Sequence, residues 1–200
     1  MYIQWCLKGV PEYPGFFSDT EARAVLYHGL PSNWLRQNAT KRLDEGLING
    51  QQALSDTALF DHVNDYARVG PLTPYISLSA GIVQLDRKLG SVPYPAWYTA
   101  ADFATEGSTG EGFIFRMWTI VAPKVSSNLL GVSDEVRDLN IFRHFWRYNR
   151  EGEIAAKLVV PFTQIQYVAK LNLQLDIVWQ EENVRFVQPE TISNLLNEIT

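Results

Sequence analysis

Apolar residues fall mainly into short runs along this chain, and clusters of Gly, Pro, Ser and Asn separate the runs. Short apolar runs between such turn residues are typical of β-strands. They predict strands at 24–27, 75–79, 113–121, 154–160, 165–169 and 175–179. The first twenty residues are rich in Pro, Gly and aromatic side chains, so they are predicted to form an irregular N-terminal arm that lies on the domain.

Helical spacing of apolar residues occurs in fewer segments. It predicts helices at 34–46, 57–67, 98–104 and 189–199. The segment 133–150 is ambiguous: Ser133 could cap a helix there, and its arginines make it the most basic stretch of the chain. Short strands with a few helices between them predict an α+β fold on a mixed, mainly antiparallel sheet, with two small sheets packed around a cleft.

The composition limits the classes of protein that the chain can represent. Its 200 residues, 46% of them hydrophobic, are enough for one domain with a sizeable core. Cys6 is the only cysteine, so no internal disulfide can form, and three widely separated histidines do not favour a metal site such as zinc. The net charge of −5 gives no general attraction for nucleic acid, although a local basic patch could suffice.

The sequence also bears on where the protein is made. Its N-terminus lacks the basic start and apolar core of a secretory signal. No apolar run approaches the roughly 18–20 residues that span a bilayer. We therefore expect a chain that is cytoplasmic at synthesis and has no membrane partner.

The most informative chemical feature is a pair of glutamates two residues apart. Glu151 and Glu153 precede the apolar run 154–160 directly. In an extended chain, side chains at i and i+2 point to the same face. Two carboxylates this close raise each other's pKa unless a nearby cation or hydrogen-bond donor stabilises their negative charges. Such a pair either faces bulk water, which is the commoner case, or takes part in chemistry.

Residues 151–165 resemble the catalytic strand region of the mono-ADP-ribosyltransferase toxins, most closely the cholera toxin and heat-labile enterotoxin group. The shared features are Glu-x-Glu, an apolar run and the turn Pro-Phe-Thr-Gln-Ile at 161–165. Pro-Tyr-Ile-Ser-Leu-Ser at 74–79 is similar to the family's second motif, with Leu78 in place of its middle Thr. Tyr-His-Gly at 27–29 resembles instead the first motif of the diphtheria toxin and poly-ADP-ribose polymerase branch, where the cholera group has an Arg.

This resemblance implies both a fold and an activity. The implied fold is an ADP-ribosyltransferase-like split β-sandwich of mainly antiparallel strands with short flanking helices. It would form a single domain over residues 1–200, with the motif core at about 24–179. The implied activity is cleavage of the nicotinamide–ribose bond of NAD, which serves as co-substrate, and transfer of ADP-ribose to an acceptor.

The motif at 151–165 and the motif at 74–79 would supply the catalytic residues. Glu153 would stabilise the oxocarbenium-like ribose that forms when nicotinamide leaves. Glu151 would orient or deprotonate the acceptor. Ser77, supported by Ser79, would hold Glu153 in place and help to position NAD.

The first motif would bind NAD. His28 would hydrogen-bond the adenosine ribose, and Gly29 would let the nicotinamide amide approach the backbone closely, with Tyr27 beside them. Tyr75 and Tyr98 are available to stack on nicotinamide, but the sequence places neither ring over the ligand.

Three interpretations of function stay open. The first is a toxin or effector that modifies a protein arginine, because a Glu at position 151 is associated in the family with arginine acceptors. The second is transfer to nucleic acid or to water; the basic, aromatic segment 140–150 lies where the family's acceptor loop stands. The third is a binding module without turnover, because His28 replaces the Arg. Glu151, Ser77 and Glu153 argue against the third.

The toxin interpretation implies further partners. A macromolecular acceptor is expected, a protein rather than nucleic acid. A neutralising antitoxin or immunity protein is a possible second partner, and delivery to a target cell by a specialised secretion route would follow synthesis in the cytoplasm.

Overall fold

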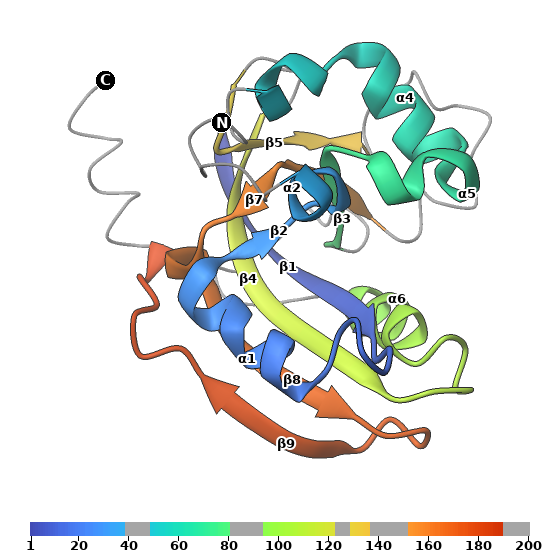
Figure 1. The fold of residues 1–200 in the computed structure, drawn as a ribbon. Helices are drawn as coiled ribbons and strands as arrows, with labels where there is room; N and C mark the ends of the chain where they lie inside the picture. The colour runs from blue at the N-terminus through green and yellow to red at the C-terminus, as the bar shows by residue number, and fades with distance from the viewer. Residues whose placement is uncertain (39–48, 81–93, 123–128, 137–151, 190–200) are drawn as a thin grey trace.

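The computed structural model describes residues 1–38, 49–80, 94–122, 129–136 and 152–189 (Figure 1). Seven strands form one sheet in the order β1-β3-β6-β5-β4-β8-β9, and two short strands form a second. The strands are β1 (Tyr2–Pro11), β2 (Leu30–Pro31), β3 (Tyr75–Ser79), β4 (Gly112–Ala122), β5 (Val132–Glu135), β6 (Glu153–Lys157), β7 (Val159–Val160), β8 (Ile165–Leu171) and β9 (Ile177–Glu182).

Short helices flank this sheet. They are α1 (Asp19–His28), α2 (Asn33–Asn38), α4 (Asp56–Asn64), α5 (Tyr66–Val69) and α6 (Tyr94–Ala104), with the 3-10 turns η1 (Gly70–Leu72) and η5 (Phe162–Gln164). The predicted mixture of a sheet-dominated core and a few short helices is confirmed. Among the pairings of the described strands only β4–β5 is parallel, so the prediction of a mainly antiparallel sheet is confirmed as well. A split β-sandwich is not confirmed, because the pairings join seven strands into one sheet.

The long strand β4 organises the sheet (Figure 1). One of its edges pairs with β1 from Tyr2↔Val121 to Pro11↔Gly112. Its other edge is shared, since β8 pairs with its first half and β5 with its end. Strand β1 also meets β3 at Leu7↔Ser79. The pairings β1-β3-β6-β5-β4-β1 therefore close a ring, and β8 and β9 extend the sheet beyond it.

The N-terminal arm predicted for the first twenty residues is wrong. Residues Tyr2–Pro11 form the strand β1, whose Trp5, Cys6 and Leu7 are buried. Aromatic and apolar residues at 2–7 favour a strand, and the first proline of the region stands at the last position of the strand, where it interrupts little of the ladder.

The strand predicted at 24–27 is also wrong, because these residues belong to α1. Ser18 caps this helix, and the side chain of Glu21 accepts from the Ser18 backbone N–H, which completes a capping box. Ala22, Val25 and Leu26 are buried along one face, as the i, i+3, i+4 spacing of a helix requires. Gly29 ends the helix at φ 88°, a conformation that glycine adopts without strain.

The other predictions agree with the structure in most segments. Strands are found at each remaining predicted site, although the last one begins at Ile177 rather than 175. Helices α2, α4, α5 and α6 confirm the helices predicted within 34–38, 57–67 and 98–104. Ser133 lies in β5 and caps no helix. The segments 39–48, 137–151 and 190–200 lie outside the described residues, and with them most of the predicted helices 133–150 and 189–199.

The core lies on both faces of this sheet. Phe113, Phe115 and Met117 of β4 are fully buried in a cluster with Val25 and Leu26 of α1. On another face, α6 packs on β1 and β4 through small residues such as Ala100 and Ala104. Among the described residues no helix is long and apolar enough to cross a membrane.

Candidate active site

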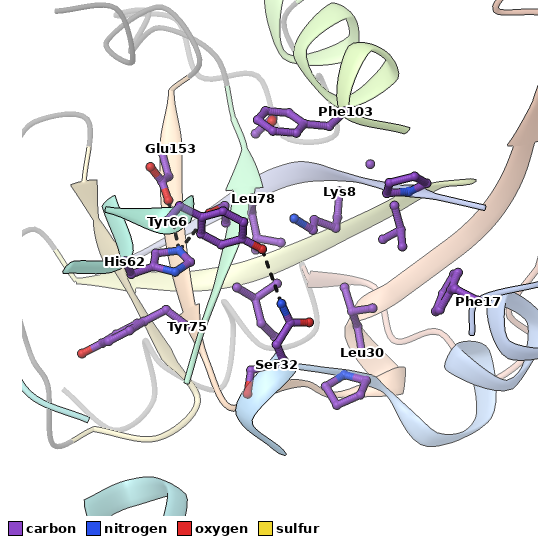
Figure 2. A pocket seen from close by; sticks show the side chains of 18 of the residues that line it. Lys8, Phe17, Leu30, Ser32, His62, Tyr66, Tyr75, Leu78, Phe103 and Glu153 are labelled. Carbon is purple, nitrogen blue, oxygen red and sulfur yellow. Dashed lines mark hydrogen bonds and ion pairs between the residues drawn. The ribbon is translucent and has the colours of Figure 1, made fainter. Parts of the chain in front are cut away.

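A cavity of about 660 Å³ lies over β1, β3 and β6 (Figure 2). This volume is in the range of small-molecule sites. Its polar and charged lining comes from several elements: Lys8, Tyr13, Ser32, Asn33, Arg36, His62, Tyr66, Ser77, Ser79, Asp102, Glu106 and Glu153. The cavity therefore contains both carboxylates and cations on an otherwise apolar and aromatic wall.

Strand pairing brings three of the predicted residues together. Glu153 is the first residue of β6 and stands opposite Ser79 of β3 in antiparallel register. Residues directly opposite each other share a face of the sheet, and Ser77 lies two positions from Ser79 on that same face. All three line the cavity. The alternation of side chains along β3 and β6 is sufficient to place them there.

His62 of α4 contacts two of these residues, Ser77 and Glu153, and Figure 2 shows its ring beside Glu153. Its Nε2 lies 2.9 Å from Ser77 Oγ and 3.4 Å from Glu153 Oε1, and its Nδ1 lies 2.8 Å from Thr73 Oγ1. The Thr73 oxygen also accepts from the Tyr75 N–H, so Thr73 is fixed at the Nδ1 side of the His62 ring. Nε2 faces the serine and the carboxylate.

The environment of Glu153 favours its ionised form. Burial acts to raise the pKa of Glu153, but the hydrogen bond and charge of His62, the Ser77 hydroxyl and the charge of Lys8 together hold that pKa below its usual value. The side chain is only 12% exposed, and Oε1 has no hydrogen-bond partner among the described residues. Among the described residues, the 3.4 Å ion pair with His62 Nε2 is thus the contact that this charged oxygen makes at the cavity wall.

Two cations line the same cavity. Lys8 of β1 projects into it (Figure 2), and burial lowers the pKa of Lys8 to about 8 although the charge of Glu153 acts to raise it. Arg36 of α2 lies 5.4 Å from the ring of Phe16 and 5.2 Å from that of Phe17. Neither cation has an ion pair among the described residues. Both are therefore available to an anionic ligand.

Aromatic side chains complete the wall. Tyr66 packs edge-on against His62 at 5.5 Å and lines the cavity, as does the exposed Phe103 of α6. Tyr75, one of the two tyrosines considered for stacking, is buried against His62, and its hydroxyl donates to the Ser55 carbonyl. Tyr98, the other one, does not line the cavity. The exposed rings that line the cavity, and so can contact a ligand, are Tyr13, Phe16, Tyr66 and Phe103.

The first predicted motif lies elsewhere. Tyr27, His28 and Gly29 are at the end of α1 and none of them lines this cavity. The ring of Tyr27 instead stacks on Arg185 at 5.0 Å. The structure does not bring the motif together with Glu153, and its predicted part in NAD binding stays untested. Glu151 lies outside the described residues.

Sequence reasoning missed Lys8, His62 and Tyr66, among other residues of this cavity, and offers Arg36 only as an alternative phosphate-binding residue with no motif behind it. A local pattern could have indicated Lys8, because the run Trp-Cys-Leu-Lys-Gly-Val is compatible with a strand that carries a cation. His62 and Tyr66 stand on a predicted helical segment, but only the packing of α4 beside β3 brings His62 to Ser77, and Tyr66 lies against His62. No local pattern reports such a contact.

We expect replacement of His62 by Gln to move the acid limb of the pH–rate profile. Gln removes the charge that helps to hold the pKa of Glu153 down, so this pKa rises and activity is lost at a higher pH as the solution is acidified. At neutral pH, kcat/KM should fall by about tenfold. The measurement is kcat/KM of the candidate reaction from pH 4 to 8. An unchanged acid limb would contradict this positioning role.

Comparisons with known proteins give a limited result. No family model matches the chain, and no curated protein matches it. Among solved structures, the chain is similar to one described as EcPltA, at 11% identity and a TM-score of 0.43, over 92% of this chain and 87% of that one. It is also similar to an arginine-to-lysine mutant of heat-labile enterotoxin with a flexible active-site loop in the A subunit, at 15% identity and a TM-score of 0.47, over 94% and 79%. These similarities are too distant to assign an activity.

Proposed function

We propose that the protein is an NAD-dependent mono-ADP-ribosyltransferase of the toxin or effector type. The observation that carries this proposal is the ionised, partly buried carboxylate of Glu153 in a cavity that also holds Lys8 and Arg36. The motif resemblance at 74–79 and 151–165 supports the same function, since the residues it marks meet at this carboxylate.

The charges of the cavity match those of NAD. The nicotinamide ring of NAD is cationic, and the ribose becomes cationic as nicotinamide leaves, whereas the pyrophosphate carries two negative charges. The carboxylate of Glu153 complements the positive charge of nicotinamide and ribose, and Lys8 and Arg36 complement the negative charge of the pyrophosphate. The cavity lining therefore carries a charge opposite to that of the nicotinamide ribose and a charge opposite to that of the pyrophosphate.

The reaction would proceed through cleavage of one bond and formation of another. The ribose C1′–nitrogen bond breaks, and its electron pair goes to nicotinamide, which leaves as a neutral molecule. Glu153 stabilises the positive charge that develops on the ribose. An acceptor nitrogen or oxygen then attacks C1′ and gives its proton to Glu151, the residue that the resemblance assigns to the acceptor. His62 and Ser77 hold the carboxylate in the position that this step requires.

The acceptor that we propose is a protein arginine. The support is the Glu at position 151, which resembles the residue of the arginine-specific members of the family. Transfer to nucleic acid and hydrolysis of NAD by water use the same bond cleavage, so they differ only in the attacking group.

Nicotinamide release by the purified protein tests the proposal. NAD labelled in the adenylate part is supplied with a cell lysate, and the label is followed on protein, on nucleic acid and in free ADP-ribose. Label on protein arginines supports the transferase, and label on nucleic acid or in free ADP-ribose identifies one of the alternatives. No release from a folded sample would overturn the proposal.

Lys8 should make NAD binding depend on pH. Because the pKa of Lys8 is about 8, the amine loses its charge as the pH rises through 8, and its attraction for the pyrophosphate is lost. We expect the KM for NAD to rise by about tenfold between pH 7 and pH 9.5. A Lys8→Arg variant, whose cation does not titrate in this range, should have a KM that is flat over the same interval. An equal rise in both proteins would exclude Lys8 as its source.

A further inference from the structure

Exposed apolar side chains gather along β9, the outermost strand of the sheet (Figure 1). Four large apolar residues on β9 and on the turns at its two ends are between 42% and 92% exposed: Leu173, Ile177, Val178 and Val184. Single exposed apolar residues are ordinary on a protein surface, whereas a group of them on one element indicates an interaction site.

The backbone of β9 has one free edge. Among the described strands, β9 pairs with β8 alone. The Asn183 N–H donates to the Gln166 carbonyl at 2.8 Å, in the same register as the β8–β9 ladder. Alternate residues of an antiparallel ladder bond to the same neighbour, so Asn183 and Glu181 bond to β8. Gln180 and Glu182 therefore direct their N–H and C=O groups outward, where an added strand could pair with them.

The sequence of this edge offers little protection against pairing. Free edges are commonly blocked by Pro, by Lys, or by a bulge. The strand Ile-Val-Trp-Gln-Glu-Glu contains neither Pro nor Lys. Its one register shift, between Lys170 and Leu171 of β8, lies at the beginning of the strand. The charges of the strand are two glutamates at its end, which repel an acidic segment and attract a basic one.

The face of β9 toward α1 is occupied. Arg23 of α1 forms an ion pair with Glu181 and lies 4.2 Å over the ring of Trp179. Glu182 differs, because it accepts a hydrogen bond from the Gln180 side chain but has no ion pair among the described residues. The strand is thus held by α1 on one face, and the carboxylate of Glu182 is available to a cation from outside.

We propose that β9 is the docking edge for an extended, basic segment of a partner protein, which adds to the sheet as a further strand. The segment would place Lys or Arg beside the glutamates and apolar residues beside Ile177 and Val178. A second copy of this chain fits poorly, because antiparallel pairing of β9 with itself sets the glutamates of each copy against the apolar end of the other. Nucleic acid is disfavoured by the same glutamates. This inference goes beyond the proposed function and does not depend on it.

A Gln180→Pro variant tests the edge. Proline removes a backbone N–H that points outward and none that bonds to β8, so the fold should persist. Gln180→Thr keeps this N–H and is the matched control. Position 180 does not line the candidate active site, so both variants should keep the circular dichroism spectrum and the nicotinamide release of the wild type.

A phage-displayed library of random peptides, about ten residues long as the longer strands are, is the probe. It is selected on the immobilised wild type. We expect the enriched peptides to alternate apolar residues with Lys or Arg. They should bind the wild type and Gln180→Thr equally, and Gln180→Pro at least about tenfold more weakly. Glu182→Lys, which reverses the available charge, should also weaken binding about tenfold.

The other outcomes would overturn this inference. They are peptides that bind Gln180→Pro as well as the wild type, enrichment of acidic peptides, and no enrichment at all. Dimers of the wild type in sedimentation, if Gln180→Pro abolishes them, would assign the edge to a second copy instead of a basic partner. None of these readouts uses NAD, so failure of the transferase proposal would leave the docking edge standing.

Discussion

Replacement of Glu153 by Gln is expected to lower kcat for nicotinamide release by about 10²- to 10³-fold. Gln keeps the size of the side chain and removes its negative charge, so the cation that develops on the ribose loses its only close stabilising charge on β6. The measurement is single-turnover release of nicotinamide at saturating NAD, because this separates the bond cleavage from substrate binding.

The fold should tolerate this change. Oε1 of Glu153 has no hydrogen-bond partner among the described residues and only a 3.4 Å ion pair with His62 Nε2, so the amide loses that ion pair but breaks no hydrogen bond there. The charge of Glu153 also helps to keep Lys8 protonated, and its loss should lower the pKa of Lys8 further. Glu182→Gln, on the exposed strand β9, is the matched control and should retain full activity. If Glu153→Gln and Glu182→Gln are equally active, Glu153 is not the catalytic carboxylate.

The strands that carry the candidate site were predictable from local sequence. Tyr75–Ser79 and the run after Glu153 have the alternation and the turn residues of strands, and the structure finds both. Their pairing as neighbours, which places Ser79 opposite Glu153, is a long-range event. The sequence motif indicated that these residues belong together, but only the register shows that they share one face.

The two wrong predictions near the N-terminus have a common physical cause. The four apolar or aromatic residues at 24–27 fit the pattern of a buried strand as well as that of a buried helix segment. The capping box Ser18-x-x-Glu21 was the local signal for a helix, and it lies just outside that run. A first strand at 24–27 makes residues 2–11 an arm outside the sheet, and Lys8 then has no place in the site.

Other parts of the site could not be predicted from local pattern at all. His62 reaches Ser77 across fifteen positions of sequence, and Arg36 lines the cavity because α2 packs beside η1 and β3. Each contact depends on how a helix lies on the sheet. A sequence pattern specifies which face of a helix is apolar. It does not specify which residue of the sheet a polar side chain of that helix will contact.

Replacement of Gly112 by Ala is expected to lower the free energy of unfolding by about 3 kcal/mol. A Cβ atom at Gly112 would lie 1.8 Å from the Ala104 carbonyl oxygen and 2.8 Å from that of Val10, and one at Gly9 would lie 1.9 Å from the Ala100 carbonyl oxygen. These are backbone atoms, which cannot turn away as a flexible side chain can. The two glycines therefore set how closely α6 approaches β1 and β4.

Urea denaturation measures this effect, and Gly110→Ala is its matched control. The nearest atom to a Cβ at Gly110 is 3.9 Å away, so this substitution should leave stability within about 0.5 kcal/mol of the wild type. For a chain of this length, the loss at Gly112 corresponds to a fall in Tm of roughly 6–12 °C. Equal stability of the two variants would show that α6 can withdraw without cost. A withdrawal of α6 would also move Phe103 at the cavity wall, so Gly112→Ala should raise the KM for NAD where Gly110→Ala does not.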